Sequence, residues 1–262
     1  MSTVKSTVTS QDGTTIAYDR TGAGPPVVLV GGGLDDGVEN APLAAELAAE
    51  FTVFNYARRG RGASGDTPPY AVRREVEDLD ALIAVAGGPV HLFGASSGGA
   101  LALEAAAAGL SVATVAVYEV PYPIGDDEVS AWRAYRTNLA TASPGDALEL
   151  FMRLAGSSDE DIVGARAAPV WADLERLAPT LPYDAACLGD GPPPRRLADV
   201  EQPVLVLTGD AGLPGLALGY FDRAAEALDD LLPNADRLTV PGQGHVADPK
   251  TLAPVLSRFF TG

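Results

Sequence analysis

The feature that most restricts the fold is a short turn between an apolar strand, which begins at Val90, and an alanine-rich helix over residues 97–109. The turn holds a G-x-S-x-G pattern formed by Gly94, Ser96 and Gly98. A chain that reverses this sharply holds its serine in a strained backbone conformation at the sheet edge, and it needs small neighbours on both sides. The alternative is a plain Gly/Ser loop that closes an ordinary strand–helix unit.

The rest of the chain alternates between strand and helix patterns. Apolar or alternating stretches predict eight strands, at 4–10, 14–19, 25–30, 51–56, the segment before Gly94, 112–118, 203–208 and 237–240. Between two of them, residues 70–86 place Val72, Val76 and Leu79 on one helical face. Parallel strands joined by helices predict an α/β fold with a doubly wound, mostly parallel sheet, whose site lies at the carboxyl ends of the strands.

One stretch interrupts this alternation after the sixth strand. Amphipathic helical segments at 128–139, 146–154 and 169–177 replace it, and a Gly/Pro-rich segment follows. We therefore expect residues 1–120 and 201–262 to form the core and residues 121–200 a helical cap or lid.

Composition limits the partners. The chain has 18 Lys and Arg against 35 Asp and Glu, a net charge of −17, which disfavours nucleic acid and anionic membranes. A single cysteine, Cys187, excludes an internal disulfide and a cysteine metal cluster. Residues 1–13 are polar, and no apolar run is long enough to span a membrane. We expect a cytoplasmic protein that binds a small molecule, and the pattern leaves the oligomeric state open.

A serine nucleophile needs a base, and the chain has two histidines. His245 ends the Gly-rich segment 241–245 just after a strand, which favours a catalytic role. His91 lies within a strand, where a structural role is expected.

The base needs an acid that fixes its tautomer. Asp210 follows the strand 203–208 and is the first candidate, although an aspartate there is also common as a turn residue. Glu119 follows the strand 112–118 and is the alternative acid.

Two N–H groups are needed for the oxyanion of a tetrahedral intermediate. The backbone N–H of Ser97 is the first candidate. The second is expected from the glycine loop after the third strand, with Gly33 preferred over Gly32. A glycine turn without a ligand is the alternative.

Together the turn at Ser96, the order Ser96, Asp210, His245 and the loop 241–245 resemble the α/β-hydrolase superfamily, over almost the whole chain. The likeness is greatest to small capped serine hydrolases and cofactor-free haloperoxidase-like esterases. It implies nucleophile, acid, base and oxyanion donors at the positions named above, with no cofactor and no metal. The chain has Gly31-Gly32 where the family usually has His-Gly, and Ala57 where it often has Asp.

A second glycine pattern, G-x-G-x-x-G at residues 60–65, follows a strand but does not open a helix, which disfavours a dinucleotide site. The neighbouring Arg58, Arg59 and Arg61 are interpreted as a solvated or ion-paired loop.

The sequence therefore predicts a serine hydrolase that cleaves an ester, thioester or lactone of a small, largely apolar substrate through an acyl-enzyme. Aromatic residues of the cap, such as Trp132 and Phe151, are expected to line part of the pocket. One alternative is a carbon–carbon bond hydrolase, lyase or perhydrolase on the same frame. Another is a non-catalytic small-molecule binding protein.

Overall fold

A computed structural model describes residues 3–213, 215–217 and 219–262. In this part of the chain, eight strands form a sheet in the order β1-β2-β4-β3-β5-β6-β7-β8, which confirms the predicted α/β fold. The strands are β1 Val4–Thr9, β2 Thr15–Gly22, β3 Pro26–Val30, β4 Thr52–Tyr56, β5 Val90–Ala95, β6 Val112–Tyr118, β7 Val204–Gly209 and β8 Ala235–Val240.

The register of the parallel strands determines where the loops meet. β1 and β2 pair antiparallel, as do β2 and β4, and all the other pairs are parallel. Ala95 pairs with Tyr118, and Tyr118 pairs with Leu207. The segments that follow β5, β6 and β7 therefore leave the sheet side by side at one edge.

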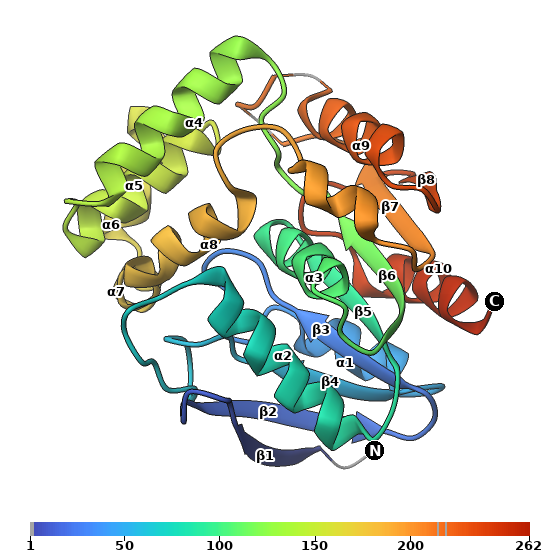
Figure 1. Ribbon diagram of the computed structural model, residues 1–262. Helices are drawn as coiled ribbons and strands as arrows, with labels where there is room; N and C mark the ends of the chain where they lie inside the picture. Colours follow the sequence, from blue (N-terminus) through green and yellow to red (C-terminus); the bar gives the residue numbers. More distant parts are fainter. Residues whose placement is uncertain (1–2, 214, 218) are drawn as a thin grey trace.

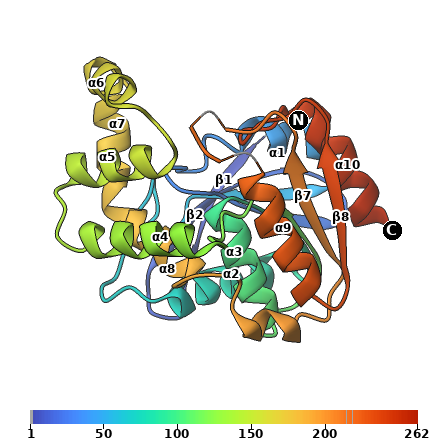
Figure 2. The ribbon, with the colours of Figure 1, turned by 90° about the horizontal axis from the view of Figure 1, so that it is seen from above.

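Helices cover both faces of the sheet (Figures 1 and 2). α2 Val72–Ala86, α3 Ser97–Ala107 and α9 Tyr220–Leu231 pack on one face, while α1 Ala41–Leu47 and α10 Pro249–Thr261 pack on the other. Alternate residues of β3 serve the two cores, since Val28 faces the first group and Val27 the second. This double burial explains why the central strands are continuous apolar runs.

Between β6 and β7 the described chain is helical. The helices are α4 Asp126–Leu139, α5 Pro144–Leu154, α6 Asp159–Ala167, α7 Trp171–Leu177 and α8 Leu181–Leu188, with 3₁₀ turns at Ala178–Thr180 and Arg195–Asp199. In Figure 1, α4 to α7 gather beyond one end of the sheet, whereas α8 lies against α3.

Two of these helices were not predicted. α6 is short and polar, and α8 carries Pro182, which resembles a helix breaker in the sequence. Proline is tolerated in the first turn of a helix, because the N–H groups there have no partner within the helix.

Some expectations fall on residues that the structure leaves out. The first two residues of the polar N-terminal segment lie outside the described residues. The sequence also predicts a helix over residues 218–232, and its first residue, Leu218, likewise lies outside them. None of the described helices has the length and apolar character needed to cross a bilayer.

Leu79 tests the packing of α2 because its side chain is fully buried in the first core. We expect Leu79→Ala to lower the free energy of unfolding by about 2–5 kcal/mol, through lost apolar contact and the cavity left behind. Urea denaturation measures this. Val85→Ala on the same helix is the matched control, since Val85 is 47% exposed and its loss is expected to change stability by about 0.5 kcal/mol or less. Equal effects of the two changes would contradict the burial of Leu79.

Candidate active site

Ser96 lies at a sharp turn between β5 and α3. Its backbone has φ 53° and ψ −128°, a conformation that side chains rarely adopt. A Cβ on Gly94 would lie 2.4 Å from the carbonyl oxygen of Gly98, and a Cβ on Gly98 would lie 2.2 Å from that of Val30. The strained serine and the need for small neighbours are both as the sequence pattern predicts.

His245 is held by a buried carboxylate. Its Nδ1 lies 2.8 Å from Oε2 of Glu119, whose side chain is fully buried. The backbone of Glu119 has a positive φ of 47°, which is uncommon for a residue other than glycine. Its Oε1 accepts a hydrogen bond from the N–H of Gly209 at 2.9 Å. A carboxylate at Nδ1 favours the tautomer with hydrogen on Nδ1, which leaves Nε2 free to accept a proton.

Asp210, the first candidate for the acid, lies elsewhere. It is exposed, and its Oδ1 accepts a hydrogen bond from the N–H of Gly242 at 2.5 Å, so it holds the loop that leads to His245. Among the described residues it makes no hydrogen bond to His245. The carboxylate that the structure places at Nδ1 of His245 is that of Glu119, the alternative candidate, because the backbone turn after β6 directs that longer side chain toward the imidazole.

Aromatic residues fix the position of the imidazole. The ring of Phe221 stacks on His245 with centroids 4.8 Å apart and planes 12° from parallel. The hydroxyl of Tyr118 donates to the carbonyl of Gly244 at 2.6 Å. His245 therefore has a defined orientation although it comes from a loop.

His91 has the structural position that its place in a strand predicts. Its Nδ1 lies 2.8 Å from Oγ1 of Thr114, and its ring stacks on Phe260. Burial lowers the pKa of His91, which favours its neutral form.

Two cavities meet at Ser96. One, of about 260 Å³, is lined mainly by apolar side chains from the helical segment and α9, including Trp132, Leu188 and Phe221. The other, of about 250 Å³, is lined in part by Asp35, Glu39 and Asn40. Ser96, His245, Gly33 and Phe151 line both cavities. Each is slightly smaller than the roughly 300–1,000 Å³ typical of drug-sized ligands, which favours a small substrate.

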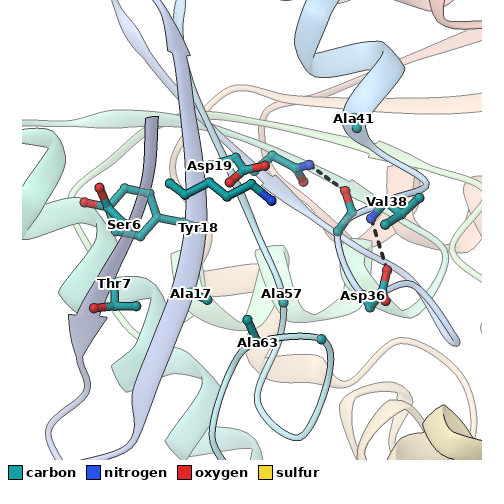
Figure 3. Close-up of a pocket in the computed structure, with 14 residues that line it drawn as sticks. Ser6, Thr7, Ala17, Tyr18, Asp19, Asp36, Val38, Ala41, Ala57 and Ala63 are labelled. Carbon is teal, nitrogen blue, oxygen red and sulfur yellow. Dashed lines mark hydrogen bonds between the residues drawn. The ribbon is translucent and has the colours of Figure 1, made fainter. Parts of the chain in front are cut away.

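A larger hollow of about 600 Å³ lies elsewhere, between the β1–β2 hairpin and the segment after β3 (Figure 3). Figure 3 shows Tyr18 and Asp19 on one side of it and Asp36 and Val38 on the other. Neither Ser96 nor His245 lines this hollow, so it lies apart from the candidate site.

The expected oxyanion donors lie around the same serine. Ser97 is the first residue of α3, and Gly33 lines both cavities. Within the described residues, neither backbone N–H donates a hydrogen bond to another group of the protein. Both are therefore free to receive a negatively charged oxygen. Gly32 lies close to Ser96, since a Cβ there would meet the Cβ of Ser96 at 3.1 Å.

The three arginines after β4 are ion-paired and fully buried rather than solvated. Arg58 pairs with Glu75 and Asp184, Arg59 with Asp78 and Asp12, and Arg61 with Asp184. No sequence pattern indicates Asp184, because it lies on the unpredicted helix α8 and carries no motif.

Cys187, one turn from Asp184 on α8, is unsuited to act as a nucleophile. Burial raises the pKa of its thiol to about 12. Among the described residues, no group of three His, Cys, Asp or Glu side chains is arranged to hold a metal ion.

Residues 22–255 match the family model described as the alpha/beta hydrolase family. A curated relative, the uncharacterized hydrolase YraK of Bacillus subtilis, is 34% identical over 96 residues. That match spans 35% of this chain and 35% of YraK.

Solved structures are similar over nearly the full length. An alpha/beta hydrolase from Sphaerobacter thermophilus is 45% identical with a TM-score of 0.84, covering 97% of this chain and 100% of that one. The esterase RhEst1 from a Rhodococcus species is 24% identical, with a TM-score of 0.72 and coverage of 100% and 99%. A bromoperoxidase from Bacillus anthracis is 19% identical, with a TM-score of 0.74 and coverage of 99% and 100%. The last two likenesses concern the fold alone.

Nitrogen-15 NMR of the imidazoles tests the partner of His245. At mildly alkaline pH, we expect the neutral ring to carry its hydrogen on Nδ1 in the native protein and in Asp210→Asn. Glu119→Gln removes the charged acceptor, so the Nε2–H tautomer is expected to become populated. The chain has two histidines, so assignment needs one further variant at His91. A tautomer shift in Asp210→Asn and none in Glu119→Gln would contradict this geometry.

Proposed function

The chain belongs to the alpha/beta hydrolase family, and we propose that it is a serine hydrolase of small esters, thioesters or lactones. The observation that carries this proposal is the position of His245. Its Nδ1 is hydrogen-bonded to the buried Glu119, and the ring lines the same two cavities as the strained Ser96. A binding protein has no need of a buried carboxylate that fixes the tautomer of an imidazole in the cavities that Ser96 lines.

The reaction proceeds in two steps on these groups. The hydroxyl oxygen of Ser96 attacks the carbonyl carbon of the substrate while His245 takes the hydroxyl proton. Glu119 stabilises the imidazolium that forms. The N–H groups of Ser97 and Gly33 bind the oxyanion. His245 then gives its proton to the leaving alcohol, and water, activated by the same imidazole, releases the acid from Ser96.

The two cavities suggest where the acyl part and the alcohol part of the substrate bind. The apolar cavity also includes Ser97, and we assign it to the acyl group. The second cavity includes Glu39 and Val246, which are exposed, so we assign it to the alcohol part, which leaves first. As carboxylates, Asp35 and Glu39 would repel an anionic alcohol part.

A fluorophosphonate probe tests the nucleophile. We expect it to label the native protein at Ser96, because the phosphorus accepts an activated serine oxygen and the adduct resembles the tetrahedral intermediate. Mass spectrometry of the labelled peptide identifies the residue, and Ser96→Ala is expected to abolish labelling. A native protein that is neither labelled nor active on p-nitrophenyl esters would overturn the proposal. Labelling with negligible ester turnover would instead favour carbon–carbon bond hydrolysis.

Esters of increasing acyl length test the apolar cavity. Each methylene that enters it is expected to raise kcat/KM about fourfold, since burying one CH₂ contributes about 0.8 kcal/mol. We expect Ala155→Leu, which narrows this cavity, to reduce kcat/KM for hexanoate about tenfold while acetate hydrolysis changes about twofold or less.

The matched control is Ala63→Leu, at an exposed position on the hollow of Figure 3. It is expected to leave the chain-length profile unchanged. If both variants shift the profile equally, or neither does, the acyl group does not occupy the apolar cavity.

A further inference from the structure

We infer that Asp184 and Arg61 are positioning residues that hold both N–H donors of the oxyanion site, so that helix α8 is part of the catalytic apparatus. This inference rests on the proposed function. It concerns residues that no sequence motif indicates and that do not themselves contact the reacting atoms.

Asp184 lies at the centre of a buried network. It comes from α8, which packs against α3 (Figure 1), and it is 6% exposed. Its Oδ1 accepts hydrogen bonds from Ser97 Oγ at 2.7 Å, Arg58 Nη1 at 2.7 Å and Arg61 Nη2 at 2.8 Å. Its Oδ2 accepts a second bond from Arg61 Nη2, also at 2.8 Å. One carboxylate therefore joins three parts of the chain: helix α8, the segment after β4 that carries Arg58 and Arg61, and the start of α3.

The bond to Ser97 fixes the first donor. Ser97 directly follows the nucleophile, and its N–H is one of the two expected oxyanion donors. Within the described part of the chain, its hydroxyl hydrogen-bonds to one partner, Asp184. Because the side chain is 3% exposed and tethered at its end, the peptide that carries the N–H loses freedom to rotate.

Arg61 fixes the second donor from the opposite side. Its Nη1 donates to the carbonyl oxygen of Gly32 at 2.5 Å. The peptide bond between Gly32 and Gly33 is trans, so this carbonyl and the N–H of Gly33 point in opposite directions. With the carbonyl held by Arg61, the N–H of Gly33 points away from the arginine. This geometry favours Gly33 over Gly32 as the second donor.

The three glycines at residues 31–33 explain why hydrogen bonds from arginine side chains are needed to orient this segment. Residues 31–33 have no side chains to pack, and the segment is not part of a strand or helix. Arg58 adds a weaker hold on the same segment, since its Nη1 donates to the carbonyl of Gly31 at 3.2 Å. Without these hydrogen bonds, a segment of three glycines would adopt many backbone conformations, and the N–H of Gly33 would have no fixed direction.

The charges of the network balance. Arg58 and Arg61 carry two positive charges, and Asp184 and Glu75 carry two negative ones. Burial alone would raise the pKa of Asp184, but the two guanidinium groups outweigh it and lower that pKa below the ordinary range. The carboxylate therefore stays ionised, and its orientation is maintained at neutral pH.

The same loop provides a matched control. Arg59 is as buried as Arg61 and donates to both oxygens of Asp78, at 2.7 and 2.8 Å. Neither residue contacts the glycine loop, Ser97 or Asp184 through a hydrogen bond in the described structure. Weakening this pair disturbs a buried ion pair without touching the oxyanion donors.

The test compares Asp184→Asn and Ser97→Ala with Asp78→Asn in the full chain. Steady-state kinetics use a p-nitrophenyl ester, and phenylboronic acid serves as the probe that forms a tetrahedral anion on Ser96. We expect Ser97→Ala to lower kcat about 10-fold and Asp184→Asn about 100-fold, with KM changed about twofold or less. The Kd for phenylboronic acid is expected to rise in parallel with the loss of kcat. Asp78→Asn is expected to lower Tm but to change kcat and that Kd about twofold or less.

The outcomes separate the two proposals. A native protein without turnover or labelling overturns the proposed function, and that measurement comes first. With an active native protein, kcat in Ser97→Ala within twofold of the native value overturns the positioning role, even if Asp184→Asn fails to fold. Losses of kcat per folded molecule that are equal in Asp184→Asn and Asp78→Asn also overturn it, because the network would then serve stability alone.

Discussion

The close approach of backbones at the turn after β5 is the constraint on which the site depends. A Cβ on Gly98 would lie 2.2 Å from the carbonyl oxygen of Val30 and 2.6 Å from that of Gly31. Such distances are impossible for any residue other than glycine. The first turn of α3 therefore rests directly on the end of β3. This contact places the serine of one loop beside the glycine segment of another, which is the arrangement an oxyanion site requires.

Burial of charge is the second requirement. The charged groups of Arg58, Arg61, Glu75 and Asp184 lie buried in one network. Taking charges out of water is costly unless each has a partner. Arg58 and Asp184 meet this condition through several short hydrogen bonds each. A network of this kind favours one geometry, because an alternative packing leaves a charge unpaired in the interior. The cap thus contributes a fixed electrostatic element as well as an apolar surface.

Glu119 and His245 follow different strands, and their contact depends on loop geometry. Glu119 lies directly beyond β6, whereas His245 follows β8, two strands away in the sheet. The loop that carries His245 reaches back across the sheet edge, held by Tyr118 and by Asp210. Asp210 therefore holds the loop rather than the imidazole, although its position after β7 resembles that of a catalytic acid.

The sequence by itself determined the sheet, the turn at Ser96 and the choice of His245 as the candidate base. Apolar runs, glycine spacing and the presence of only two histidines are local or compositional facts, and each has one ready physical interpretation. It offered two candidate acids and preferred Asp210, whereas the structure places Glu119 at the imidazole. Both residues follow buried strands, so the sequence had no means to separate them. Only the tertiary structure distinguished them, through the positive φ of Glu119. Likewise the role of Asp184 depends on contacts across 87 to 126 positions of sequence, which no local pattern encodes.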